Sequence, residues 1–470
     1  MKRIAPAAIA AVALLAAGCG GGGGGSLPEG AAKSPAEAVA FVSLDTDASS
    51  DQWQKAKKLA ARFPGGAMVV DEVEKYRQAV GPEVDLAWLD FANDGDDFVI
   101  LTKPSNLARL KELAAPDNFA YAELSDGWVA IGDQSEAFKK QAQGDKLDSD
   151  GGFKDAFGKL DSGAAVRAWV RGPTVQALLD RALVSGGAAP RITHEIGDLK
   201  SISADVRAED DGATAAVYGT IDPAPDPATF SPSLPDSTPG GALLYVSATG
   251  LDAATRIILR MVGESNPRFE TQLDQVQGVL GITLEGDIYP LLKGESALAV
   301  YRGGRIPPIL YQLKVDDEQK ADRLLRRFSS IAAVAGGVDV STDEIEGRTV
   351  QKLTFTDSNV TVWDGVAEGR LFVTNARELA RETIAGPEHA LADDDLFRSA
   401  RKAADLPGAV IAFAYGDLEH GLPYVFRQVE RGGDVVPPAA RANTKPLQTS
   451  LVYTVKDGDS LRMSGFVTIK

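Results

Sequence analysis

The two halves of this 470-residue chain carry the same short patterns in the same order. The first is a Ser-Leu-Pro-acid step followed by an apolar run, and the second is an acid-Gly pair ahead of another apolar run. The third is a Leu followed six residues later by Phe and a basic residue, and the fourth is an Asp-Gly pair whose glycine precedes another by seven residues. The paired segments are 26–43 with 233–247, 126–133 with 368–375, 147–154 with 391–398, and 211–219 with 457–465. Four matches in order predict a duplicated unit of about 200 residues.

A proline-rich segment separates the two copies. Residues 222–240 hold six prolines in nineteen positions, a composition typical of an extended, semi-rigid connector. With 470 residues, 44% apolar and 24% charged, the chain is long enough for two globular domains. The predicted organisation is a signal peptide at 1–18, a lipidated cysteine and glycine-rich tether at 19–33, repeat domain 1 at 34–221, the linker at 222–240, and repeat domain 2 at 241–470.

Hairpin and helix patterns within each copy favour an α+β fold. Apolar runs at 86–89 and 98–101 flank Asn93-Asp94-Gly95, and runs at 298–301 and 309–313 flank Gly303-Gly304. Glycine and Asn accept the positive φ of a tight turn, so both patterns predict hairpins. Residues 316–331 read as a helix with an acidic start and apolar residues at helical spacing. We expect two tandem repeats of a mainly antiparallel sheet with helices packed on one face.

The N-terminus is typical of a secreted lipoprotein. Met1, Lys2 and Arg3 precede an uncharged, Ala-rich stretch that ends at Gly18, which is too short for a spanning helix of about 20 residues. The sequence Leu-Ala-Ala-Gly before Cys19 resembles the bacterial lipobox, although Ala16 stands where that pattern prefers Leu. The resemblance implies cleavage before Cys19, the only cysteine, and its thioether linkage to diacylglycerol.

Lipidation would fix the location of the folded part. The Gly20 to Gly25 run predicts a flexible tether, which would hold the protein at the outer face of the cell membrane, or at the periplasmic face if an outer membrane is present. The net charge of −17 disfavours nucleic acid and anionic lipid headgroups as partners. We therefore expect an envelope protein, a lipid or a small apolar molecule as the partner, besides the membrane that holds the anchor.

Several landmarks resemble the DUF3352 family of bacterial lipoproteins and membrane-anchored proteins. They are the Leu234-Pro235 step before Leu244-Tyr245-Val246-Ser247, residues 287–290 leading into 294–299, and residues 346–350 ahead of 369–373. The resemblance covers nearly all of the chain after Cys19 and is stronger in the second half. The family carries no assigned activity, so the resemblance implies a fold and an envelope location alone.

A search for catalytic, cofactor and metal signatures yields no predicted site besides Cys19. His194, His389 and His420 lie far apart and lack metal-helix spacing. Ser296 lies in a Gly-x-Ser pattern without the closing glycine of a nucleophile elbow, and Ala297 begins a predicted strand rather than a helix. Residues 45–51 alternate acids like a calcium loop but lack its glycine and its twelfth-position Glu, so Ser50 and Asp51 read as a helix cap. Residues 393–395 read as a helix N-terminus, as do Asp148 and Asp150 in the first copy.

Two other groups of residues have a structural and a binding interpretation. The five tryptophans are interpreted mainly as core, and the basic side chains on the 316–331 helix as a solvated face rather than an anion site. The tryptophans are Trp53, Trp88, Trp128, Trp169 and Trp363, and the arginines are Arg323, Arg326 and Arg327.

Three functions remain open. A non-catalytic binding or adaptor lipoprotein would have one apolar patch across both copies and no cluster of carboxylates with shifted pKa. An envelope hydrolase would bring two carboxylates, or Ser296 with a histidine, together in a cleft. A structural spacer would have a uniformly polar surface. We favour the binding lipoprotein.

Overall fold

The computed structural model of the chain describes residues 26–91, 95, 97–115, 119–185, 197–266, 268–358 and 360–470. The predicted signal peptide and Cys19 therefore lie outside the described residues. The last part of the predicted tether is inside them. There, Glu29–Lys33 forms a short 3-10 helix, η1, in which Gly30 and Ala31 are buried.

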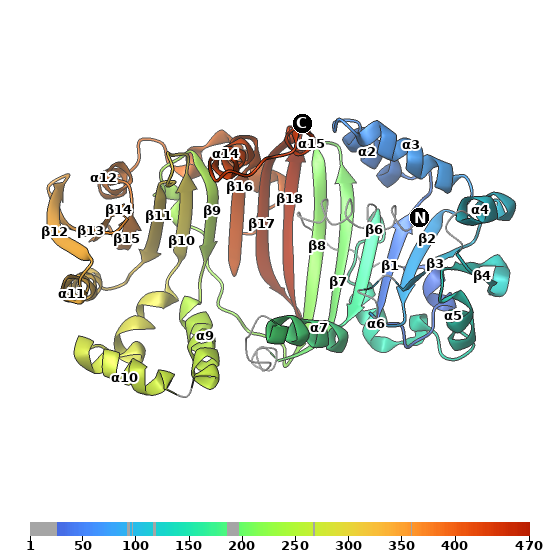
Figure 1. Cartoon of the computed structure of the whole chain (residues 1–470), viewed down its shortest axis with the longest axis horizontal. Helices are drawn as coiled ribbons and strands as arrows, with labels where there is room; N and C mark the ends of the chain where they lie inside the picture. Colours follow the sequence, from blue (N-terminus) through green and yellow to red (C-terminus); the bar gives the residue numbers. More distant parts are fainter. Residues whose placement is uncertain are drawn as a thin grey trace.

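One antiparallel sheet runs through the molecule (Figure 1). Each of its eighteen strands pairs antiparallel with its neighbours. From one edge to the other the order is β4 (Tyr121–Glu123), β5 (Val129–Ile131), β3 (Phe98–Thr102), β2 (Glu83–Trp88), β1 (Ala40–Asp45), β6 (Val166–Arg171), β7 (Asp198–Glu209), β8 (Gly212–Asp222), β18 (Ser460–Ile469), β17 (Leu447–Asp457), β16 (Ala412–Asp417), β9 (Ala242–Ala248), β10 (Ser296–Tyr301), β11 (Ile309–Lys314), β15 (Arg370–Thr374), β14 (Val360–Ala367), β13 (Arg348–Phe355) and β12 (Val338–Ile345). This mixed architecture confirms the α+β class and the mainly antiparallel sheet.

Figure 1 shows helices at both ends of the strands and toward both edges of the sheet. They are α2 (Asp51–Ala60), α3 (Gly66–Arg77), α4 (Leu107–Ala114), α5 (Ser135–Gln141), α6 (Gly151–Phe157), α7 (Gly172–Ser185), α9 (Leu251–Ser265), α10 (Phe269–Leu280), α11 (Glu318–Ala335), α12 (Arg377–Ala385), α13 (Asp395–Ala403), α14 (Leu418–Arg431) and α15 (Pro438–Thr444). Short turns of helix include η4 (Ser125–Gly127), η5 (Leu147–Ser149), η6 (Leu234–Asp236), η7 (Leu284–Ile288), η8 (Leu291–Lys293) and η9 (Leu391–Asp393).

The two main cores lie on the same face of the sheet, called the buried face below. In the first half, Phe41 of β1 packs against Phe153 and Phe157 of α6, and Phe153 meets Trp169 edge-on. In the second half, Tyr245 of β9 packs against Phe397 of α13. Aromatic side chains from helix and sheet thus close each core.

Helices also pack on the other face, which corrects the expectation of helices on one face only. Leu101 of β3 joins the core beneath α5 and α6, whereas its neighbour Ile100 packs against Leu110 of α4. Successive strand residues point to opposite faces, so α4 lies on the second face. Leu371 and Phe372 of β15 divide in the same way, with Leu371 beneath α11. The prediction failed because both faces of these strands are apolar.

The predicted turns and caps are mostly confirmed. The two hairpins form as β2–β3 and β10–β11, and the Asp317 side chain caps α11 through the amide of Lys320. The fourth pair of matching segments is wrong in register. Gly212 begins β8 after a turn at 210–211, whereas Gly458 lies within the turn at 458–459. Glycine is needed at both positions, but for different reasons: Gly212 allows a close strand contact, and Gly458 adopts a positive φ in the turn.

The sheet is continuous between the two halves through β8 and β18. These strands pair over nine positions, from Ser460 opposite Thr220 to Thr468 opposite Gly212. Lys159 adds an ion pair to Asp459 at 2.6 Å. A Cβ at Gly212 would lie 2.1 Å from the carbonyl oxygen of Val467, so glycine permits the close approach of the two strands.

Candidate functional site

The residues considered for chemistry in the sequence do not converge. Cys19 and His194 lie outside the described residues, so the structure does not place them. His389 is exposed, and His420 Nδ1 lies 2.7 Å from Asp417 Oδ2 at the start of α14. The Ser296 hydroxyl donates to the carbonyl oxygen of Ala248 at 3.1 Å, which is a structural contact between β10 and β9.

The acidic segments cap helices, as predicted. Ser50 Oγ accepts from the Trp53 amide at 3.1 Å, and Asp394 accepts from the amides of α13. Asp150 does the same for Phe153 at 2.8 Å. These contacts satisfy orphan amides at helix starts.

Most of the tryptophans lie in or against the cores, and two of the α11 arginines make structural contacts, as the sequence analysis predicted. Trp88, Trp128 and Trp169 are buried in the cores, and Trp363 packs partly buried against one of them. On α11, Arg326 pairs with Asp322, and Arg327 donates to the carbonyl oxygen of Gly281 at 2.7 Å.

A row of charged side chains crosses the buried face of the first half, and the sequence analysis missed it. Asp85 of β2, Ser43 of β1, Arg167 of β6 and Asp205 of β7 are direct cross-strand partners in that order. The same row continues across β8 and β18 into the second half, where the positions are Tyr453, Phe413, Ser247 and Ala297. Within this row, the charged residues are therefore confined to the first half of the sheet.

Asp85 is the most deeply buried member of this row. It is fully buried, and neither carboxylate oxygen has a hydrogen-bond partner among the described residues. Burial, and then the nearby Glu83 carboxylate, raise the pKa of Asp85 well above its usual range. Gly30 of η1 lies against it, since a Cβ on Gly30 would fall 1.8 Å from Asp85 Oδ2.

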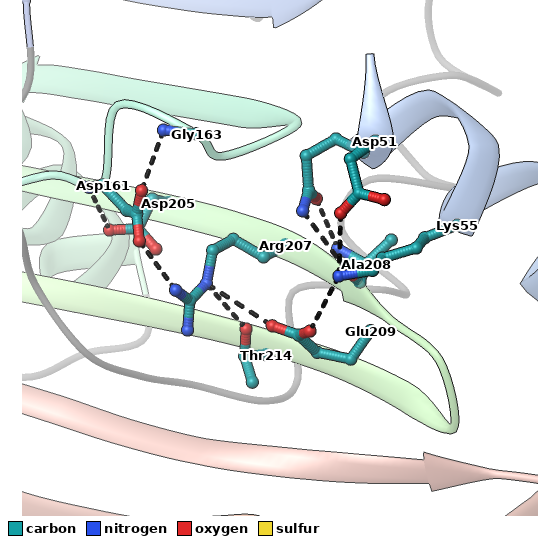
Figure 2. Close-up of polar contacts among 10 residues, drawn as sticks. Asp51, Lys55, Asp161, Gly163, Asp205, Arg207, Ala208, Glu209 and Thr214 are labelled. Carbon is teal, nitrogen blue, oxygen red and sulfur yellow. Dashed lines mark hydrogen bonds and ion pairs between the residues drawn. The ribbon is translucent and has the colours of Figure 1, made fainter. Parts of the chain in front are cut away.

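Asp205 connects this row to the protein surface (Figure 2). Desolvation raises its pKa to about 6, and its carboxylate accepts from the Asp161 amide at 3.3 Å. Asp161 in turn pairs with Arg207 at 2.7 Å, and Arg207 lies near Glu209, which contacts Lys55 of α2. The network fastens α2 to β7 by charged contacts.

The binding hypothesis predicted no cluster of carboxylates with shifted pKa, and Asp85 and Asp205 do not form one, because β1 and β6 lie between their strands. They also do not match the hydrolase hypothesis, because both side chains are buried, Asp85 against Gly30 of η1 and Asp205 against the Asp161 amide, rather than converging in a cleft. Among the described residues, no group of three or more His, Cys, Asp or Glu side chains is placed to hold a metal ion. The row is a buried polar element of the fold.

The opposite face of the ten strands from β2 to β10 is different in kind, and we call it the open face. Three neighbouring rows cross it, and none contains a charged residue. The first row is Leu86, Val42, Ala168, Ala204, Val217, Met463, Thr454, Ala412, Ala248 and Ser296. The second is Val84, Leu44, Val166, Val206, Ala215, Gly465, Val452, Ala414, Val246 and Leu298. The third, from β7 to β10, is Ala208, Ala213, Val467, Ser450, Gly416, Leu244 and Val300.

Apolar side chains of β18, β9 and β10 on this face reach solvent although their strands are central, whereas Val206, Ala208, Ala213 and Ala215 of β7 and β8 are buried and Ala208 packs with Leu59 of α2. Leu244 is 42% exposed, Val246 36%, Leu298 38% and Met463 43%. Figure 1 shows why: α2, α3 and α14 lie near one end of the strands and α7 and α9 near the other, while α4 and α11 lie toward the sheet's edges. Within the described chain, no helix is drawn across the middle of these strands.

A small hollow lies at the outer end of this surface. It has a volume of about 320 Å³ and lies between α4 and the edge strands, with Phe119, Tyr121 and Ile131 in its wall. Ile131 is the cross-strand partner of Ile100, which follows Leu86 in the first row. The hollow thus continues the apolar surface at the edge of the sheet.

The sequence signal for the open face was present but had two interpretations. Strands such as 40–45 and 242–248 are apolar on both faces, which is also the pattern of a strand buried between two layers. The sequence shows that alternate positions of these strands carry no charge, but it does not show that no described helix covers them. No helix among the described residues is long and apolar enough to cross a membrane.

Comparison with known proteins identifies a family but no activity. No curated protein matches the sequence. Solved structures titled crystal forms III, I and IV of TP0453 align with 43%, 43% and 41% of this chain and with 82%, 81% and 83% of their own. Their identities are 10%, 12% and 11%, with TM-scores of 0.24, 0.25 and 0.23. The model of the family described as "Protein of unknown function (DUF3352)" matches residues 108–449, more than half of the sequence, and the chain belongs to that family.

Proposed function

We propose that this protein is a lipid-anchored envelope protein that binds the acyl chains of a lipid on the open face of its sheet. One observation carries the proposal: three uncharged rows run side by side across the open face, and four of their large apolar side chains are exposed. An antiparallel sheet with one solvated face normally alternates apolar and polar residues. A contiguous apolar surface exposed to water is typical of a binding site.

The size of the open face suits a lipid. Neighbouring strands lie about 4.8 Å apart, so the five strands from β18 to β10, which carry the exposed side chains, span about 20 Å. A single leaflet of the hydrocarbon core is about 15 Å thick, so extended acyl chains fit along a row. Each methylene removed from water contributes about 0.8 kcal/mol to the binding free energy. The many methylenes of one acyl chain together can therefore give tight binding without any polar contact.

The residue types favour acyl chains over a protein partner. The rows consist mainly of Ala, Val and Leu, with Thr454, Ser450 and Ser296 as the hydroxyls. Protein interfaces are enriched in Tyr, Trp and Arg at their centres, and the three rows contain none of these. Small aliphatic side chains instead give a smooth surface for a flexible hydrocarbon.

The expected anchor gives the lipid a source. Lipidation of Cys19 followed by the Gly20 to Gly25 tether would keep the sheet close to a bilayer on the outer side of the cell membrane. The proposal therefore retains the location and the membrane partner expected from the sequence, and it assigns no catalytic residue, metal or cofactor.

We also propose that the chain is a duplicated unit, with repeats at 34–221 and 241–470 joined by the linker at 222–240. The strand order supports it, because reading outward from β8 gives β7, β6, β1, β2, β3 and β5, and reading outward from β18 gives β17, β16, β9, β10, β11 and β15. The edge-on pairs Phe153–Trp169 and Phe397–Tyr415 support it as well, with centroids 5.2 Å and 5.1 Å apart. The open face would then be one site made by both repeats.

The experiment is native mass spectrometry of the protein purified gently from its own host's envelope. We expect a defined extra mass that fragments as an acyl lipid. The double substitution Val246→Asp with Leu298→Asp should remove that mass while leaving the far-UV circular dichroism unchanged.

A matched control uses Val425→Asp with Val429→Asp, two exposed apolar side chains on α14 that lie outside the three rows. This variant should keep the bound mass. A bare protein mass from wild type, together with no uptake of added fatty acid, would contradict the proposal and favour the structural spacer.

A further inference from the structure

Helices α9 and α10 form an arm without a buried face. The arm comprises residues 251–280, and Figure 1 shows it beyond the ends of β9 and β10, outside the layers that cover the sheet. None of the side chains described in α9, at 251–263, is buried, and none in α10 is. Helices of 15 and 12 residues are marginal in water unless one face packs against something.

The arm nevertheless carries a regular apolar stripe. Ile258 and Val262 lie one turn apart on α9 and are 56% and 40% exposed. Val276 and Val279 lie one turn apart on α10 and are 51% and 82% exposed. Residues at these spacings share one face of a helix. Two adjacent helices therefore present aliphatic faces to the solvent.

Polar contacts rather than apolar packing fasten the arm to the body. Arg256 of α9 makes a bidentate pair with Glu285 and stacks over Tyr289, 3.8 Å from its ring centroid. Arg327 of α11 donates to the carbonyl oxygen of Gly281, at the end of α10. These contacts fix the base of the arm and leave Ile258, Val262 and Val276 exposed, whereas Val279, also exposed, borders a hollow next to Arg326 and Arg327 of α11.

Three observations indicate a lipid bilayer as that partner. Ile258, Val262, Val276 and Val279 are exposed and aliphatic, and charged side chains such as Arg260, Glu270 and Asp274 are exposed elsewhere on the same two helices, as in an amphipathic surface helix. The arm follows directly from β9, whose Leu244 and Val246 belong to the open face, so its surface lies next to the proposed acyl-chain site. The net charge of −17 disfavours an anionic surface. Burial of aliphatic side chains at a bilayer surface needs no opposite charge.

We propose that the arm docks on a neutral bilayer surface by inserting the aliphatic faces of α9 and α10. This inference rests on the proposed function, because it supplies the contact through which acyl chains reach the open face. It differs from the lipid anchor, which tethers the chain but does not orient it.

The test is flotation of unlipidated protein with phosphatidylcholine vesicles. We use residues 26–470, which contain every described residue and lack the Cys19 anchor. We expect binding that changes less than about twofold between about 0.05 M and about 0.5 M salt, since the contact is apolar. Ile258→Glu with Val279→Glu should weaken binding roughly tenfold or more, because charge at the bilayer interface opposes insertion.

The matched control is Val425→Glu with Val429→Glu on α14, a pair with the spacing and similar exposure of Ile258 and Val262. It should bind vesicles like wild type. Wild-type protein that does not float, or an arm variant that floats as well as the control, overturns the proposal. A dimer in native mass spectrometry that the arm substitutions dissociate also overturns it, since a second copy would then cover the arm.

A separate measurement keeps this inference distinct from the proposed function. Uptake of a fluorescent fatty acid without vesicles reports the open face alone. The arm variant should retain that uptake while losing vesicle binding. An arm variant that no longer folds would lose both uptake and vesicle binding, and the loss of its thermal unfolding transition would reveal this. The test is then repeated with Val279→Ser, a milder change at an exposed position.

Discussion

Leu298 of β10 lies directly opposite Val246 of β9, and both side chains are more than one third exposed in the middle of an eighteen-stranded sheet. Central strands normally gain stability by burying such pairs on both faces or by placing polar residues on the exposed one. This pair does neither. It marks a surface that the described fold leaves uncovered, and it is the starting point for the predictions below.

Polar substitution of this pair should affect binding far more than stability. Replacing both residues, Leu298→Asn with Val246→Asn, removes aliphatic contact area from the open face. We expect the dissociation constant for a fluorescent fatty acid to rise at least about tenfold, a loss of about 1.4 kcal/mol. The free energy of unfolding should change by about 1 kcal/mol or less, because both side chains are partly solvated already. Equal affinity in the two proteins would place the acyl chain elsewhere.

We expect that only glycine fits at position 30, because the buried Asp85 carboxyl occupies the space of a Cβ there. A Cβ at Gly30 would lie 1.8 Å from Asp85 Oδ2, so Gly30→Ala should lower the free energy of unfolding by about 1–3 kcal/mol. Asp85→Ala removes that oxygen and should recover much of the loss in the double variant. Gly65→Ala is the control, since a Cβ there has no neighbour within 4 Å. Additive effects of the Gly30 and Asp85 changes would contradict this contact.

Asp205 should make stability fall as pH rises between about 4 and about 6. Burial raises its pKa to about 6 in the folded chain from its ordinary value of 3.8, so in this range the folded protein holds a proton that the unfolded chain has lost. The contribution is fully present below the lower value and is lost above the upper one. Asp205→Asn removes this titration, which is on the order of 3 kcal/mol across the window. Chemical denaturation at several pH values measures it, and parallel curves for the two proteins would refute the assignment.

The joint between β8 and β18 should make the two halves unfold together. Calorimetry of wild type should show one transition, because nine paired positions and shared core residues cross the joint. Gly212→Val places a side chain against Val467 and Phe466 and should separate the transition into two. Gly458→Ala, in the neighbouring turn with open space around it, is expected to cost about 1 kcal/mol for its positive φ without splitting the transition.

Local structure was predictable from sequence where one short-range cause decides it. The hairpin at 298–313, the caps at Ser50 and Asp394, and the buried Trp169 each depend on a turn residue, a polar side chain before a helix, or an aromatic residue in an apolar run. These causes act over a few residues, so they are visible without the fold.

The charged row and the open face depend on pairing between distant strands, so they could not be predicted from the sequence. The charged row from Asp85 to Asp205 draws its members from strands as far apart as β2 and β7, and nothing local brings them together. The open face depends on where helices are absent, since residues 242–248 have the same apolar pattern as a strand covered on both sides. The match between Gly212 and Gly458 suggested equivalent positions, but the two glycines have different roles. Gly212 permits the close approach of β8 to β18, and Gly458 takes the positive φ of a turn.

Photocrosslinking of a diazirine-bearing fatty acid to the purified protein tests the central claim most directly. Peptide mapping of the labelled protein locates the acyl chain. The account predicts labels on β9 and β10, at Leu244, Val246 and Leu298, and along the rows toward β1, all displaced by unlabelled fatty acid. Labels confined to the helices, or labels that excess fatty acid does not displace, would contradict an acyl-chain site on the open face.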